Sequence, residues 1–310
     1  MSEHASRRRF LALAGSTTVA ALAGCSGGDG GGTETGSMGE ATGTESMGGG
    51  MTETGSMDGT AGTEGGMASG PVTVTVRIEN VAPADFYGSE TPTGGQVWIT
   101  PGAYAVHAGE NPIYTEGEAA STGLEALAEA GPPTGFPDEP GLVSELRGMT
   151  GEMGVASAGA YAPETTVADP NDPMGEVPGA PPIAPGGAFE FDVEAEPGQR
   201  LSFASMFVPS NDVFFSPTAA GIALWPEGEE PVEGDVTAAV ELWDAGTEPN
   251  ARPPGEGPDQ APAQESPDQG DDEGGVVRRL ADVGDGHEYP AASDAIRVTL
   301  TPGGSMGGGS

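Results

Sequence analysis

Residues 201–212 read Leu-Ser-Phe-Ala-Ser-Met-Phe-Val-Pro-Ser-Asn-Asp, and this stretch is the most informative part of the chain. Leu201, Phe203 and Phe207 occupy alternate positions in it, which is typical of a β-strand with one face in a core. A Pro-Gly pair at 197–198 predicts a turn before the strand. The stretch therefore predicts a strand that ends in a polar run at Asp212.

Working outward, the same alternation of apolar and polar residues recurs along the chain. It is found in residues 72–79, 189–194, 236–243 and 296–301, and residues 98–106 are also strand-like. Strands of this length, joined by Pro and Gly turns and each with one polar face, pack as a sandwich or a barrel. The sequence therefore predicts an all-β fold.

Two short helices are expected to interrupt the strands. Thr122 and Glu125 have the spacing of a capping box, and Gly131 followed by proline predicts the end of that helix. Leu142, Val143 and Leu146 predict a second helix of one or two turns. Residues 249–275 are rich in Pro, Gly and acid and predict a long irregular loop inside the domain.

Several of these blocks resemble the spondin domain family and occur in family order. The blocks are residues 201–212, 243–248, 117–129 with the upstream segments 78–81 and 106–107, and 294–300. The resemblance implies a C2-like antiparallel β-sandwich over residues 71–302. Animal members of the family are secreted matrix and adhesion proteins, so the resemblance implies extracellular binding rather than catalysis.

The resemblance also implies a calcium site in the loops at one end of the sandwich. Its carboxylates correspond here to Asp212, Asp244 and Glu248, and Asn211 could add a carbonyl oxygen. Calcium takes six to eight oxygen ligands, which such loops can supply. Glu248 replaces the family's aspartate and is one methylene longer, and all three residues could instead be ordinary exposed acids. The acidic run 268–273 lacks the ligand spacing of a calcium loop and is interpreted as solvated acid.

The charge of the chain excludes several classes of function. The net charge is −38, and every one of the 10 basic residues is arginine. A chain this acidic lacks the basic surface that nucleic acids or anionic membranes require. The acid excess and the absence of lysine favour a halophilic source, although a GC-rich genome would also replace lysine by arginine.

The N-terminus predicts export and anchoring. Residues 1–24 combine Arg7 and Arg8, a short apolar stretch and small residues, which predicts a twin-arginine signal peptide, with a general-secretion signal as the alternative. The signal ends in a lipobox-like Leu-Ala-Gly-Cys, so we expect lipidation of Cys25. Residues 25–70 predict a disordered Gly-rich tether, which as a coil would span about 35–40 Å. The tail 303–310 has the same composition.

Together these features predict a lipid-anchored, noncatalytic binding protein on the extracellular face of the cytoplasmic membrane. Its ligand would be an unidentified extracellular or cell-envelope molecule, and it would touch the membrane only through Cys25. A secreted hydrolase on a β-sandwich is an alternative, with His107 or His287 in a catalytic triad. A solute-binding lipoprotein is another, although such proteins are usually built from alternating strands and helices, a pattern absent here.

Overall fold

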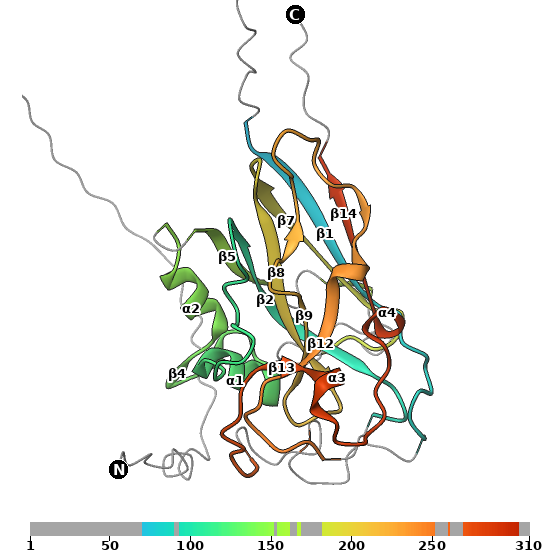
Figure 1. Cartoon of the computed structure of the whole chain (residues 1–310). Coiled ribbons are helices and arrows are strands. Elements are labelled where there is room, and N and C mark those ends of the chain that lie inside the picture. Colours follow the sequence, from blue (N-terminus) through green and yellow to red (C-terminus); the bar gives the residue numbers. More distant parts are fainter. Residues whose placement is uncertain are drawn as a thin grey trace, which may run out of the picture. The chain divides into compact units, whose positions relative to one another are not determined.

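The computed structural model describes residues 70–89, 93–151, 154–161, 166–168, 182–251, 260 and 269–303. The predicted signal peptide with Arg7 and Arg8, the lipidation site Cys25, almost all of the tether and nearly all of the tail lie outside these residues. Strands dominate the described part, and its helices are short, so the predicted all-β sandwich is confirmed (Figure 1).

The strands form two antiparallel sheets. The order in the first sheet is β11 (Gly234–Asp235), β14 (Ile296–Pro302), β1 (Val72–Asn80), β7 (Ala188–Ala195) and β6 (Thr166–Ala168). The order in the second is β13 (Arg278–Arg279), β12 (Val240–Asp244), β9 (Val213–Pro217), β8 (Arg200–Val208), β2 (Trp98–His107) and β5 (Val155–Tyr161), with β10 (Ile222–Ala223) beside β8. A small hairpin is formed by β3 (Gly135–Phe136) and β4 (Glu139–Pro140).

The main core lies between the two sheets and follows from the alternation in the sequence. On β1, Val76 is paired with Phe191 of β7 and with Leu300 of β14, and all three side chains are buried. Phe203 and Phe207 of β8 belong to the same core. Burial of each such side chain contributes about 1.5–3 kcal/mol of transfer free energy. The register is therefore strongly specified, because a slip of one residue would expose every one of these side chains.

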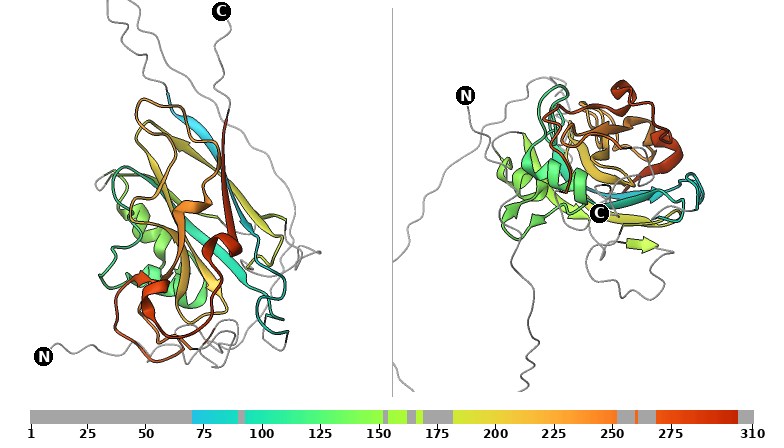
Figure 2. Two further views of the ribbon diagram at one scale, coloured as in Figure 1. Left: turned by 45° about the vertical axis from the view of Figure 1, so that its right-hand side comes forward. Right: turned by 90° about the horizontal axis from the view of Figure 1, so that it is seen from below.

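The central strands β8 and β9 of the second sheet are buried on both faces, which corrects the prediction that each strand has one polar face. Leu127 of α1 (Thr122–Ala130) and Leu146 of α2 (Leu142–Gly148) pack with Ala204 and Trp243 on the face away from the first sheet. Figure 2 shows both helices gathered on one side of the molecule. Ala204 is a small residue on this face of β8, so it leaves room for the helix side chains.

Both predicted helices are present, but the predicted cap of the first is wrong. Its N-cap is Ser121, whose Oγ accepts a hydrogen bond from the Leu124 amide at 3.2 Å. The acid that completes this end is Glu145 of α2, which accepts from Ser121 Oγ at 2.5 Å and from the Gly123 amide at 2.8 Å. Gly131 ends the helix in the left-handed region at φ 93°, as predicted.

The predicted strand 236–243 is only half correct. Its first part forms a 3-10 turn, η2 (Thr237–Ala239), because Asp235 Oδ1 accepts from the Thr237 amide at 2.9 Å. Two four-residue helices, α3 (Leu280–Val283) and α4 (Ala292–Ala295), were not predicted, since they are too short to show a period. The described residues within 249–275 contain neither helix nor strand, as expected of an irregular loop.

The two ends of the sandwich differ in what they carry. Val74 pairs with Pro302, so the chain enters and leaves the domain at the same end. The loops that follow β8 and β12 lie at the opposite end (Figure 1). The candidate site is at this second end, which we call the loop end.

Candidate functional site

Asp212 lies at the loop end because a tight turn follows β8. Ser210 Oγ donates to the Phe207 carbonyl at 2.5 Å and accepts from the Val213 amide at 3.1 Å. This turn returns the chain as β9 and turns the Asp212 carboxylate into the loops, where its exposure is 0 %. The local sequence therefore places an acid immediately before a buried strand.

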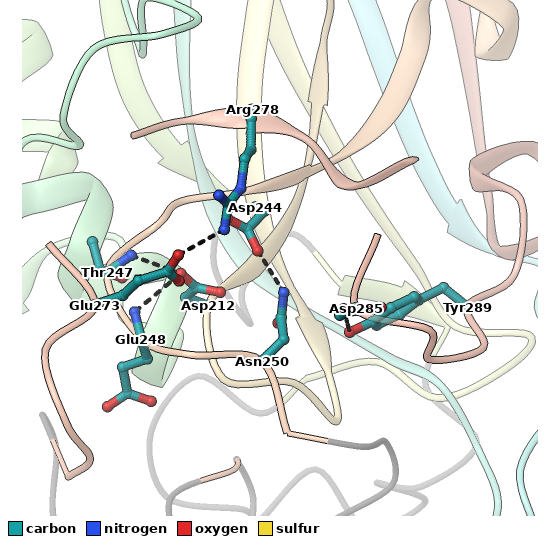
Figure 3. Close-up of polar contacts among 9 residues, drawn as sticks. All are labelled: Asp212, Asp244, Thr247, Glu248, Asn250, Glu273, Arg278, Asp285 and Tyr289. Atoms are coloured by element: carbon teal, nitrogen blue, oxygen red, sulfur yellow. Dashed lines mark hydrogen bonds and ion pairs between the residues drawn. The ribbon is translucent and has the colours of Figure 1, made fainter. Parts of the chain in front are cut away.

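The Asp212 carboxylate is held by one oxygen only. Its Oδ2 accepts from the Thr247 amide at 2.8 Å, from the Glu248 amide at 3.2 Å and from Thr247 Oγ1 at 3.3 Å (Figure 3). Its Oδ1 is also buried but has no hydrogen-bond partner among the described residues. An unpaired buried polar atom is unfavourable in free energy, and such atoms are rare in folded proteins.

Asp244 is the last residue of β12 and is paired in register with Val213, the residue after Asp212. Its side chain is also 0 % exposed. Oδ2 accepts from Asn250 Nδ2 at 2.5 Å, and Oδ1 accepts from Arg278 Nε at 3.1 Å. The pairing of β9 with β12 therefore brings two buried carboxylates to the same place, as predicted.

The two carboxylates are electrostatically unfavourable neighbours. Burial, together with the charge of Asp244, raises the pKa of Asp212 to about 7, although the hydrogen bonds from the Thr247 and Glu248 amides act to lower it. Burial also raises the pKa of Asp244, while Arg278 opposes this effect. Near neutral pH the pair therefore depends on a proton on one of the carboxyls or on a nearby positive charge, which Arg278 supplies beside Asp244.

Two further residues complete this cluster. Glu273 accepts from Arg278 Nη2 at 2.8 Å, and its charge helps to raise the pKa of Asp212. Asn250, which donates to Asp244, has a buried Oδ1 without a partner in the described part of the chain. Figure 3 shows Asp212, Asp244 and Glu273 converging, with Arg278 between the last two. We call these five residues the carboxylate cluster: Asp212, Asp244, Asn250, Glu273 and Arg278.

Glu248 contacts the carboxylate cluster only through its backbone amide. Its amide binds Asp212, but its side chain points away from the two aspartates (Figure 3). There it accepts from Asn211 Nδ2 at 3.3 Å, and a Cβ atom added at Gly270 would lie 2.2 Å from its Oε1. The structure thus brings Asp212 and Asp244 together and directs the third predicted ligand elsewhere.

Asn211 also has another role than the predicted one. Its Oδ1 accepts from the Ala251 amide at 2.9 Å and from Gln260 Nε2 at 3.2 Å, so it ties down the start of the long loop. Neither local spacing nor the family resemblance identifies Asn250, Glu273 and Arg278 as neighbours of the aspartates. Glu273 lies at the end of the acidic run 268–273 that was interpreted as solvated, and nothing in its local spacing distinguishes it.

The atoms of the carboxylate cluster that could bind a metal ion are the side-chain oxygens of Asp212, Asp244, Asn250 and Glu273, the type of ligand that calcium prefers. The unpartnered Oδ1 atoms of Asp212 and Asn250 are free to bind a cation, whereas Arg278 now supplies the positive charge next to Asp244. Within the residues that the structure describes, no group of three or more His, Cys, Asp or Glu side chains is already arranged as a metal centre. A cation would therefore have to displace Arg278 to gain a full set of ligands.

The histidines of the hydrolase alternative lie elsewhere. His107 Nε2 lies 2.9 Å from Ser202 Oγ, at the end of the sandwich where the chain enters and leaves. The two side chains are 1 % and 0 % exposed, so a substrate has no access to that hydroxyl. Burial and the nearby Arg200 lower the pKa of His107 to about 4, which keeps the ring neutral. His287 lies in a turn, where its amide donates to Asp285 Oδ1 at 2.8 Å.

We compared the chain with protein-family models and with curated proteins. No family model matches the chain, and no curated protein matches it. Among the helices that the structure describes, none has the length and apolarity needed to cross a membrane. The spondin resemblance therefore remains a prediction that depends on the motifs quoted above.

Proposed function

We propose that this protein is a lipid-anchored, noncatalytic binding protein outside the cell, and that its spondin-like sandwich binds calcium in the carboxylate cluster. The observation that carries the proposal is the pair of fully buried aspartates, one of which has an unpartnered oxygen. Structural acids are usually exposed or fully paired, because burial of an unpaired charge is costly. A divalent cation would neutralise both aspartates and provide the missing partner.

The candidate ligands come from three separate segments. Asp212 would contribute Oδ1, Asp244 and Glu273 their carboxylates, and Asn250 its Oδ1. The displaced Arg278 is about one third exposed and can turn into solvent. A cation would thus connect the loop after β8, the end of β12 and the segment before β13, and so rigidify the loop end.

The position of the cluster suits a surface binding protein. Both chain termini leave the sandwich at the other end. If Cys25 carries the lipid, the chain from the anchor joins the sandwich at that end rather than at the loop end. Loops at the distal end of a rigid sandwich are a common location of binding sites.

Calorimetry with calcium tests the cation site. The full chain, stripped with a chelator and kept in high salt, is titrated with CaCl₂ beside the variants Asp212→Asn and Asp244→Asn. We expect saturable binding with a Kd of about 10⁻³ M or tighter, as in extracellular calcium modules, and loss of about tenfold or more in either variant.

The matched control is Asp192→Asn, an exposed acid on β7 that accepts from Thr75 Oγ1 at 2.7 Å. It removes one negative charge, as the two test variants do, from a chain with a net charge of −38, and it does not alter the carboxylate cluster. Equal weakening in all three variants would indicate nonspecific attraction of calcium to an acidic surface and would contradict the proposal. Absence of saturable binding to the parent chain would do the same.

A further inference from the structure

A cavity lies beside the carboxylate cluster. Its volume is about 720 Å³, and it is bounded by β12 on one side and by the segment from Arg279 to Ser293 on the other. This volume is in the range of small-molecule binding sites. We call it the β12 cavity.

The β12 cavity has apolar side chains from both of its sides. Val240 and Leu242 of β12 and Leu280 of α3 line it, and each is less than a tenth exposed because it also packs in the main core. Tyr289 lines it as well, and its ring packs against Phe207 with 6.1 Å between centroids. These side chains are anchored in the core, so this part of the lining is preformed.

The polar groups of the cavity are both acceptors and donors. Asp285 accepts from the His287 amide at 2.8 Å and from Tyr289 Oη at 3.1 Å, which holds the carboxylate in place with further lone pairs available (Figure 3). Glu241, Arg279 and His287 also line the cavity. A ligand therefore meets carboxylate acceptors, guanidinium donors and an imidazole around an apolar surface.

The charges in the cavity disfavour an anionic ligand. The positive charge of Arg279 is already balanced by Glu241 at 2.5 Å and by Glu116 at 3.8 Å, and its guanidinium lies over the Trp243 ring. The net charge of −38 repels anions further. A cationic ligand would have to displace Arg279 from Glu241 before that carboxylate could pair with it.

We propose that the β12 cavity binds a neutral saccharide of one or two rings. Sugar hydroxyls donate and accept, so they match the mixed lining, and the apolar face of a sugar ring matches the ring of Tyr289, a partly exposed apolar surface in the lining. This site would give an anchored surface protein a carbohydrate ligand in the cell envelope. The proposal does not rest on calcium, because none of the lining residues belongs to the carboxylate cluster.

The test is ligand-observed NMR and calorimetry on the full chain with a panel of defined sugars. The neutral probes are glucose, galactose, mannose, N-acetylglucosamine, cellobiose and lactose, and the charged probes are galacturonate and glucosamine. We expect saturable binding of at least one neutral sugar with a Kd of about 10⁻³ M or tighter. The charged forms should bind more weakly than their neutral parents.

Variants localise the binding. Ala281→Trp places a large ring on an exposed residue of the cavity wall and should weaken binding by about tenfold or more. Ala220→Trp is the matched control, since Ala220 is also exposed but lies outside the cavity lining, and it should bind as the parent does. Asp285→Asn keeps the acceptor for the His287 amide and should weaken binding severalfold through loss of one carboxylate oxygen.

Three results would overturn the proposal: no saturable binding of any neutral sugar, binding that Ala281→Trp leaves unchanged, or tighter binding of a charged sugar. Repeating the titration in a chelator separates this proposal from the calcium proposal. Sugar binding that persists without calcium supports the β12 cavity even if the carboxylate cluster binds no cation. Sugar binding lost in chelator would show that the ligand is held through calcium and would contradict an independent site.

Discussion

Each end of the sandwich buries a pair of polar side chains, and the two pairs behave in opposite ways. At the end where the chain enters and leaves, His107 Nε2 and Ser202 Oγ lie 2.9 Å apart and burial keeps the imidazole neutral, although its Nδ1 has no hydrogen-bond partner among the described residues. At the loop end, Asp212 and Asp244 are like charges, and Asp212 Oδ1 is without a partner among the described residues. Both ends therefore contain an unpartnered buried atom, and what distinguishes the loop end is the like charge of its two buried carboxylates.

The largest expected effect comes from removing the positive charge at the loop end. Arg278→Gln deprives Asp244 of its ion pair at 3.1 Å and leaves buried carboxylates without a counter-charge. We expect the free energy of unfolding in chelator at pH 8 to fall by about 2–4 kcal/mol, slightly less than for a fully buried pair because Arg278 is partly exposed. Urea unfolding followed by circular dichroism measures this change.

Calcium should reverse much of that loss, because the cation replaces the arginine charge. Arg279→Gln is the control: its ion pair with Glu241 is on the surface and should be worth at most about 1 kcal/mol. A large loss in Arg278→Gln that calcium does not restore would mean that the cluster is a structural ion pair rather than a cation site.

A smaller effect of opposite sign is expected for Asp212→Asn. Because burial raises the pKa of Asp212 to about 7, above its ordinary value of 3.8, the folded chain holds this proton more tightly than the unfolded chain. The stability that comes from this tighter proton binding is complete below pH 3.8 and is lost as the pH rises through 7. In chelator at pH 8 the variant should therefore be more stable than the parent by about 1–3 kcal/mol, and the gain should shrink toward pH 4.

Unfolding curves from pH 4 to pH 8 measure this difference, with Asp192→Asn as the control without a pH-dependent gain. A site residue whose replacement stabilises the protein indicates a functional constraint. Destabilisation of Asp212→Asn at pH 8 would instead show that the ionised carboxylate is structurally required, and the contrast between the two ends would disappear.

The smallest effect is expected at the other end, in His107→Gln. Burial lowers the pKa of His107 from 6.5 to about 4, so the folded chain binds this proton less readily than the unfolded chain. The stability that the neutral His107 ring contributes is complete above pH 6.5 and is lost as the pH falls toward 4. A glutamine amide can still bond Ser202 but does not titrate, so the variant should gain about 1–2 kcal/mol relative to the parent between pH 7 and pH 4.5.

His287→Gln is the control, since His287 lies partly exposed in a turn. The readout is the difference in unfolding free energy between variant and parent at each pH, which cancels the titration of the many carboxylates. An unchanged difference from pH 7 to pH 4.5 would mean that His107 takes up a proton as readily in the folded chain as in the unfolded chain, so that burial does not keep the ring neutral in acid.

Part of the candidate site could be predicted and part could not, for a clear reason. Asp212 and Asp244 each follow an apolar strand, and the ends of neighbouring strands meet at one edge of a sheet. Arg278 reaches Asp244 across 34 residues, through the pairing of β13 with β12. No local sequence pattern encodes that approach, so the sequence does not predict that Arg278 and Glu273 lie next to the two aspartates.

The sequence by itself determined the all-β class, most of the long strands and the two predicted helices, because alternation and helix-ending glycine act within a few residues. Tertiary structure decided the rest: that both faces of β8 are buried, that Glu145 of a second helix completes the cap at Ser121, and that Glu248 turns away from the aspartates. Each of these outcomes depends on which distant segment packs alongside, and burial is a property of the assembled sheets.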